Sequence, residues 1–131
     1  MSYKILVVDD EKDIVEVVSK KLKAHDYEVA VAYDGEEALS KVQEEEPDIM
    51  LLDLMMPKLN GFEVLQKVRE SFTKKWIPVI IVSANTDLNS VNKSYGLEAD
   101  HYLTKPCSFE AILRGIETMI SLIPLRKQPN Q

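Results

Sequence analysis

The chain has 131 residues, and its 16 Lys and Arg against 22 Asp and Glu give a formal net charge of −6 at pH 7. This length is typical of one compact domain with a sizeable core, and the acidic balance disfavours nucleic acid as a direct partner. One cysteine, Cys107, excludes an intrachain disulfide, and no apolar export segment precedes the first predicted strand. We therefore expect a protein of the reducing cytoplasm, with no membrane as a partner.

Short β-branched runs alternate with segments of helical period along the chain. The predicted strands are Lys4–Val8, Tyr27–Ala32, Asp48–Asp53, Pro78–Ser83 and Asp100–Thr104. Asp10 is placed to cap the first helix. The apolar face of that helix is expected at Ile14, Val17, Val18, the stem of Lys21, and Leu22. Further helices are predicted from Gly35 to about Gln43, over Phe62–Arg69, over Asp87–Tyr95, and from Phe109 to Ile123.

Five such repeats predict an α/β fold, in which a doubly wound, five-stranded parallel sheet lies between helices on both faces. The second and third strands lack strict alternation, so we expect each to be buried on both faces. One domain is expected over residues 1–123. The polar stretch Pro124–Gln131 is predicted to be a tail or the stub of a linker.

Four of the strand-like runs end in residues that can touch a phosphate or a metal: Asp9-Asp10, Asp53, Ser83 and Lys105-Pro106. The carboxyl ends of parallel strands share one edge of the sheet, so we expect these side chains to meet. Converging carboxylates repel one another by about 4 kcal/mol per close pair at an effective dielectric near 20. Mg²⁺ suits such a cluster, since it takes one or two carboxylates, waters and phosphate oxygens. The pattern predicts a phosphoryl group held there, with an aspartate able to accept it.

A longer set of motifs carries a family resemblance. The motifs are Asp9-Asp10, Asp53-Leu54-Met55-Met56-Pro57, Asn60-Gly61, Ser83-Ala84 and Tyr102-Leu103-Thr104-Lys105-Pro106. Together they resemble the receiver domain of two-component response regulators, over about Tyr3 to Ile123. The resemblance implies a flavodoxin-like fold with strand order 2-1-3-4-5.

The resemblance also implies the chemistry of the site. Asp53 would accept a phosphoryl group from a histidine kinase or a histidine phosphotransfer protein, and Lys105 would pair with the phosphoryl oxygens. Ser83 and Tyr102 would be the switch residues. Such a chain is a phosphoacceptor signalling domain that promotes its own phosphorylation and dephosphorylation, rather than an enzyme with a separate substrate.

For the metal, the resemblance implies Mg²⁺, with Mn²⁺ as a substitute. Asp10 and Asp53 would bind it directly, Asp9 through water, and Met55 through its backbone carbonyl. Family members usually hold the peptide bond between Lys105 and Pro106 in the cis form, which proline permits.

Each residue has an ordinary explanation on its own, such as a helix cap for Asp10 or a solvated turn for Lys105, but their joint occurrence favours a site. A flavodoxin shares the architecture, yet the anions within 9–13 would repel a flavin phosphate. An aspartyl-phosphate phosphatase would carry an acid in place of Met55. A pseudo-receiver that only binds partners typically lacks an acidic residue or the lysine, and here all are present.

Overall fold

The computed structural model describes residues 2–56, 59–72, 76–84 and 87–126, without the side chains of residues 71, 72, 125 and 126. Its strands are β1 (Lys4–Val8), β2 (Glu28–Ala32), β3 (Ile49–Leu52), β4 (Val79–Ser83) and β5 (His101–Thr104). Its helices are α1 (Lys12–Ala24), α2 (Gly35–Glu45), α3 (Gly61–Lys67), the π-helical turn η1 (Val68–Phe72), α4 (Leu88–Gly96) and α5 (Phe109–Arg126). Among the described residues, no helix is long and apolar enough to cross a membrane.

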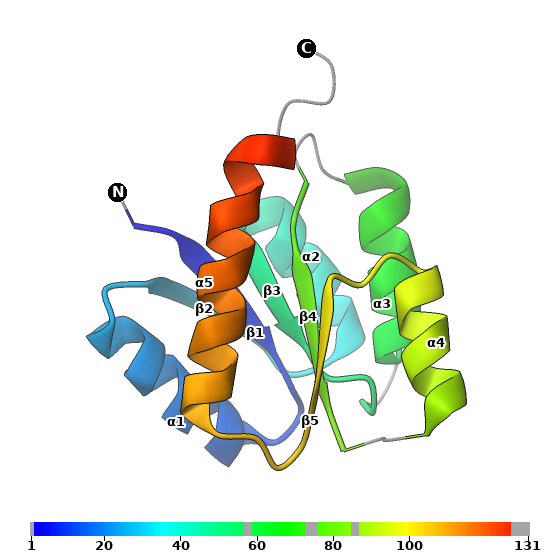
Figure 1. Cartoon of the computed structure of the whole chain (residues 1–131), viewed down its shortest axis with the longest axis horizontal. Helices are drawn as coiled ribbons and strands as arrows, with labels where there is room; N and C mark the ends of the chain where they lie inside the picture. The colour runs from blue at the N-terminus through cyan, green and yellow to red at the C-terminus, as the bar shows by residue number, and fades with distance from the viewer. Residues whose placement is uncertain (1, 57–58, 73–75, 85–86, 127–131) are drawn as a thin grey trace.

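All strand pairs are parallel, and the strand order is β2-β1-β3-β4-β5. One hydrophobic cluster joins α1 and α5 to the sheet, and the other joins α2, α3 and residues at the end of α4 to the opposite face, as Figure 1 shows. The predicted fold class and strand order are therefore confirmed. The central strand β3 is buried on both faces because both helix layers cover it.

Two expectations about burial are wrong. Strand β2 is only partly buried, because it lies at an edge of the sheet rather than near its centre. In α1 the buried residues are Val15, Ser19 and Leu22, whereas Ile14 and Val17 are exposed. The helix is therefore rotated from the predicted face, and a polar serine occupies a core position that an apolar pattern does not reveal.

Two helix ends also differ from the prediction. The cap of α1 is Glu11 and not Asp10, and its side chain makes no capping hydrogen bond. Helix α5 runs through Pro124 to Arg126, three residues beyond the predicted end at Ile123. Because proline has no N–H, the Ile120 carbonyl lacks its usual intrahelical donor at this position. The remainder of the predicted tail, residues 127–131, lies outside the described part of the chain.

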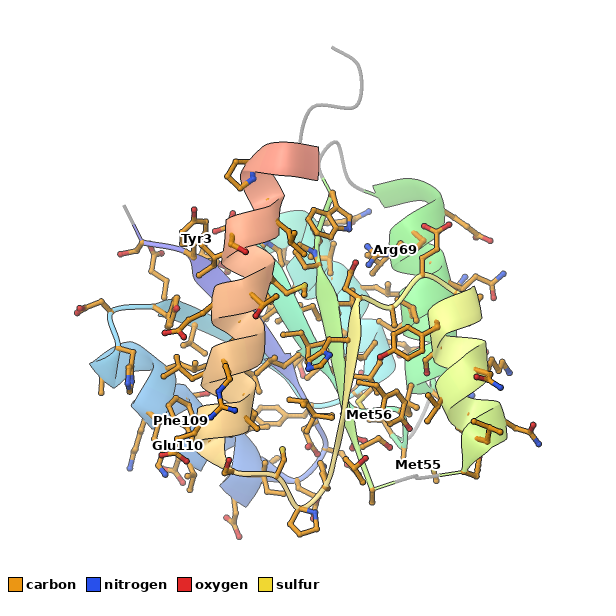
Figure 2. The ribbon with its side chains drawn as sticks, in the orientation of Figure 1. Tyr3, Met55, Met56, Arg69, Phe109 and Glu110 are labelled. Carbon is orange, nitrogen blue, oxygen red and sulfur yellow. The ribbon has the colours of Figure 1, made fainter. Side chains whose placement is uncertain are left out.

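A buried ion pair between Arg69 and Asp100 connects elements at the end of the sheet where the strands begin. Arg69 in η1 donates from Nη2 to Asp100 Oδ2 at 2.7 Å and from Nη1 to the Ile77 carbonyl at 2.7 Å. It also donates from Nε to the Glu98 carbonyl at 3.0 Å. Asp100 Oδ2 in turn accepts the backbone N–H of Val79, the first residue of β4, at 2.8 Å. Arg69 thus joins the end of α3 to the starts of β4 and β5, far from Met55 in Figure 2.

Replacing Asp100 should test this clamp. The side chains of Arg69 and Asp100 are 14% and 11% exposed, so Asp100→Ala leaves a buried guanidinium and a strand N–H without their shared acceptor. We expect the free energy of unfolding to fall by about 2–4 kcal/mol, measured by urea denaturation. As a control, Glu45→Gln breaks the more exposed pair with Lys4 and should cost about 1 kcal/mol or less. Equal losses in the two variants would contradict the role given to Asp100.

Candidate functional site at the carboxyl ends of the strands

The residues expected to form a site lie directly after the strands, held by backbone hydrogen bonds that extend the sheet by one residue. The N–H of Asp9 donates to the Ala32 carbonyl at 3.1 Å, and the N–H of Asp53 donates to the Val8 carbonyl at 3.0 Å. On the other side, the N–H of Lys105 donates to the Ser83 carbonyl at 2.8 Å. The sheet therefore fixes the positions of these side chains before they interact with one another.

Three carboxylates converge at this edge. Asp9, Asp10 and Asp53 each offer an oxygen within 4.8 Å of the others, so the cluster could hold a metal ion. Asp9 and Asp53 are each 5% exposed, whereas Asp10 is exposed. Oxygen ligands at this spacing, with one ligand open to water, fit a hard divalent cation such as Mg²⁺.

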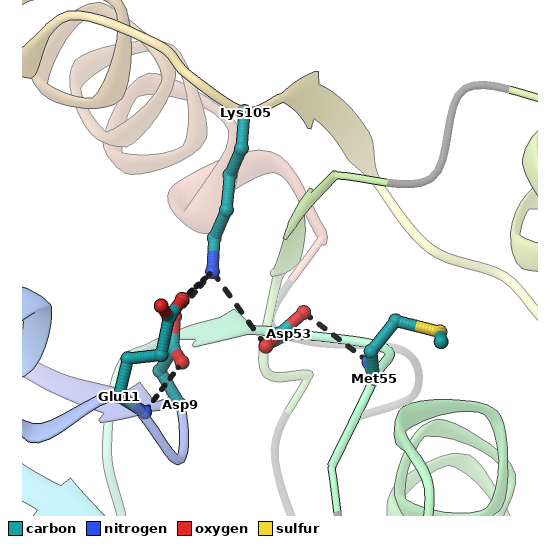
Figure 3. A network of polar contacts seen from close by, with 5 residues as sticks. All are labelled: Asp9, Glu11, Asp53, Met55 and Lys105. Carbon is teal, nitrogen blue, oxygen red and sulfur yellow. Dashed lines mark hydrogen bonds and ion pairs between the residues drawn. The ribbon is translucent and has the colours of Figure 1, made fainter.

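Lys105 reaches into the same cluster, as Figure 3 shows. Its Nζ lies 2.7 Å from Asp9 Oδ2, 3.3 Å from Glu11 Oε1 and 3.6 Å from Asp53 Oδ2. The peptide bond between Lys105 and Pro106 is cis, which matches the expectation. The ammonium partly neutralises the carboxylates, but it lies closer to the β1 side of the cluster than to Asp53.

The charges in the cluster shift two pKa values. Burial raises the pKa of the Asp53 carboxyl to about 6, and the nearby Asp9 and Asp10 act in the same direction. The backbone N–H of Met55, which donates to Asp53 Oδ1 at 3.2 Å, and the Lys105 ammonium oppose this rise. Burial lowers the pKa of Lys105, but the hydrogen bond that its ammonium donates to Asp9 and the charge of Asp53 outweigh burial and raise the pKa overall. Lys105 therefore stays protonated, while Asp53 is a carboxylate in an unfavourable setting.

Ser83 and Tyr102 lie together on the β4 and β5 side of the site. Ser83 is fully buried, and it lies on the same face of the sheet as Tyr102, which pairs with Ile81 two residues before Ser83. The Tyr102 ring is partly buried against the cluster that contains α2 and α3, and burial raises the pKa of its phenol. The two residues named as a switch are thus close neighbours on adjacent strands.

The segment after Asp53 is packed closely against the start of α3. Asn60 caps α3 by accepting the N–H of Glu63, and Glu63 accepts the N–H of Asn60 in return. A Cβ at Gly61 would lie 2.5 Å from the Asp53 carbonyl oxygen, so glycine is required for this approach. Met55 is 63% exposed, and its side chain points away from Asp53 in Figure 3. Pro57 lies outside the described residues.

One member of the site was not predicted from the sequence. Glu11 contacts Lys105 through its side chain, and its backbone N–H donates to Asp9 Oδ1 at 3.0 Å. The available signal was its place between the Asp9-Asp10 pair and a helix, with a side chain too long for an ordinary cap.

Cys107 lines a groove of about 630 Å³ between α1 and α5, next to Lys105. The groove also includes the exposed side chains of Ile14 and Val17, which explains why their apolar surface is not part of the core. Burial raises the pKa of the Cys107 thiol. A thiol with a raised pKa is less often ionised, so we expect Cys107 to be unreactive.

The raised pKa of Asp53 predicts that Asp53→Asn stabilises the metal-free protein. The folded state holds the Asp53 proton up to about pH 6, whereas an unfolded carboxyl releases it near pH 4, so wild-type stability falls across this range. Above about pH 6 the variant should be more stable by about 1–3 kcal/mol, and the difference should shrink toward about pH 4. Urea denaturation at a series of pH values measures it. A variant less stable than wild type at pH 8 would contradict this account.

The family model of the response regulator receiver domain matches residues 5–117. The chain is similar to the receiver domain of the Francisella response regulator 1452, with 31% identity and a TM-score of 0.84 over 92% of this chain and 98% of that one. It is also similar to a BeF3-activated DrrB receiver domain, with 33% identity and a TM-score of 0.82 over 92% and 99%. A CheY-like receiver domain protein of Methanospirillum hungatei gives 28% identity and a TM-score of 0.85 over 92% and 96%. The chain therefore belongs to the response regulator receiver domain family.

Proposed function

We propose that this receiver domain accepts a phosphoryl group on Asp53 in a Mg²⁺-dependent reaction and changes conformation in response. The observation that carries the proposal is the position of Asp53 in the cluster. It ends the central strand, contacts the Lys105 ammonium at 3.6 Å, and has a pKa raised to about 6 beside two further carboxylates. A carboxylate so strained by burial and like charge is stabilised by a cation, and the same cation draws in an anionic phosphoryl group.

The side chains around Asp53 have separate roles in this proposal. Lys105 neutralises the phosphoryl oxygens as they replace the Asp53 carboxylate charge. The Ser83 hydroxyl donates to the phosphoryl group, and Tyr102, its neighbour on the same face of the sheet, responds on β5. Pro106 fixes the position of Lys105 at the end of β5. Since protein groups here position reactants and neutralise charge, the domain needs no further catalytic base.

We propose that Asp10 and Asp53 bind Mg²⁺ directly, Asp9 through water, and Met55 through its carbonyl. Asp10 is exposed and suited to direct ligation, whereas Asp9 is committed to Lys105 at 2.7 Å and to the Glu11 N–H at 3.0 Å. When bound, Mg²⁺ supplies positive charge that offsets the carboxylates and the transferred phosphoryl oxygens.

The donor would be a histidine kinase or a histidine phosphotransfer protein, and a downstream effector would recognise the changed surface. We place this exchange in the cytoplasm, where Cys107 stays a free thiol. We assign the receiver domain to residues 1–123 together with the end of α5, which continues to Arg126, and the rest of the stretch 124–131 to a tail or linker stub.

Phosphorylation should occur once, at Asp53. After treatment with acetyl phosphate and Mg²⁺, intact-mass analysis should show a single phosphoryl adduct, because Asp53 is the carboxylate at the end of the central strand. The adduct should be lost in Asp53→Asn and in the presence of a chelator. An adduct that persists in Asp53→Asn would refute the assignment.

The two neighbouring acids should differ in their effect on the metal. Asp10→Ala should weaken Mg²⁺ binding more than Asp9→Ala, since loss of a direct ligand outweighs loss of a contact through water. Residues that hold a metal ligand indirectly typically change metal affinity by about tenfold or more, so we expect at least this loss of affinity in Asp9→Ala. Titration followed by NMR or by Trp76 fluorescence ranks the two variants. A larger effect of Asp9→Ala would reverse the ligand roles proposed here.

Met55 should favour a long-lived phosphoryl group. Hydrolysis requires a water aligned with the aspartyl phosphate, and the Met55 side chain offers no group able to orient one. By the family resemblance, the side chain two positions after the switch serine also affects this water; here it is Asn85, which lies outside the described residues. Met55→Asn should speed loss of phosphate about two- to tenfold, the effect of one added hydrogen bond, in a time course after donor removal. Met55→Leu, which adds no polar group, should match wild type, and an equal acceleration in both variants would show that bulk decides the rate.

A further inference from the structure

Lys105 has more carboxylate partners than the proposed phosphoryl contact requires. Its Nζ lies 2.7 Å from Asp9 and 3.3 Å from Glu11, but 3.6 Å from Asp53. In Figure 3 the contacts with Asp9 and Glu11 lie on one side of the ammonium and the contact with Asp53 on the other. The ammonium is therefore divided between the start of α1 and the residue proposed to accept the phosphoryl group.

Among the three carboxylates around Lys105, the Glu11 side chain is the one to which we have given no role in binding the metal or the phosphoryl group. It occupies the cap position of α1, but its side chain makes no capping hydrogen bond and is 60% exposed. Its carboxylate instead turns toward Lys105, while its backbone N–H holds Asp9 Oδ1 at 3.0 Å. A single residue thus orients both Asp9 and Lys105 from the same end of α1.

We propose that Glu11 is a positioning residue that holds the Lys105 ammonium toward α1 and thereby slows its engagement with the phosphoryl group on Asp53. The inference rests on the proposed function, because it concerns the rate of that same reaction. The ammonium donates to Asp9 and Glu11 but lies 3.6 Å from Asp53, so the attraction of the Glu11 carboxylate holds Nζ away from the Asp53 side. An exposed charged pair of this kind shifts an equilibrium about two- to fivefold, which sets the size of the expected effect.

The first test separates the contact from the charge. Glu11→Gln removes the charge, whereas Glu11→Asp keeps it on a shorter side chain that favours capping α1 over reaching Lys105. Both variants should raise the limiting rate of phosphorylation by acetyl phosphate about two- to fivefold at saturating Mg²⁺. Glu16→Gln is the matched control, since Glu16 lies on the same helix and pairs instead with Lys20 at 3.6 Å. It should leave the rate unchanged. If Glu16→Gln also raises the rate, or if Glu11→Asp leaves the rate at the wild-type value, general repulsion of the anionic donor is responsible and the proposal is wrong.

The second test asks whether Glu11 acts through Lys105. In a Lys105→Ala background, which should accept phosphate more slowly, adding Glu11→Gln should bring no further change in the limiting rate. The same acceleration in that background would overturn the proposal.

The third test does not depend on phosphorylation. In the metal-free protein, the NMR signals of the Lys105 Cε and Nζ groups should shift in Glu11→Gln and stay in place in Glu16→Gln. Unchanged Lys105 signals in Glu11→Gln would overturn this inference alone. A wild-type protein that takes up no phosphoryl group would overturn the proposed function, and the inference with it.

Discussion

The like charges of Asp9, Asp10 and Asp53 are forced together by the backbone of a parallel sheet, and most of the site follows from that constraint. The carboxylates lie within 4.8 Å of one another because β1 and β3 are neighbours in register, not because they attract. The stability of the sheet, whose central strands are covered by helices, offsets the cost of this mutual repulsion. Burial raises the pKa of Asp53 to about 6, and the charges of Asp9 and Asp10 add to this rise. A cation reduces the repulsion between these carboxylates, so we expect the site to depend on a divalent metal.

At the opposite end of the sheet, the aspartates accept hydrogen bonds from the backbone of neighbouring strands. Asp48, just before β3, accepts the N–H of Lys4 at the start of β1 at 2.8 Å. Asp100, just before β5, accepts the N–H of Val79 at the start of β4 at the same distance. These two carboxylates satisfy strand donors that would otherwise lack partners, and Arg69 and Lys4 lie nearby with opposite charge. Aspartates that precede strands therefore stabilise the fold, while those that follow strands are left facing one another and are available for chemistry.

The sequence allowed the strands and their polar ends to be predicted, because apolar runs that stop at Asp53, Ser83 or Lys105 are local patterns. It did not allow the rotation of α1 to be predicted, since Ile14 and Val17 form as regular an apolar stripe as Val15 and Leu22, and only tertiary packing decides between them. The exposure of β2 depends on strand order, which no local pattern contains. The contact between Glu11 and Lys105 joins residues 94 positions apart, so it depends on the assembled sheet.

Lys105 connects the cluster of Asp9, Asp10 and Asp53 to β5, a strand at the edge of the sheet. Its backbone is hydrogen-bonded to Ser83 at the end of β4, while its side chain crosses to the acids after β1 and β3. Strand β5 lies at the edge of the sheet with one neighbour and is only partly buried, whereas β3 is buried along its whole length. In the proposed function, a change of charge at Asp53 alters the partners of Lys105, which directly follows β5. Tyr102 lies on that strand and Ser83 lies on its neighbour β4, on the same face of the sheet, so the proposed switch residues lie beside the backbone that carries Lys105.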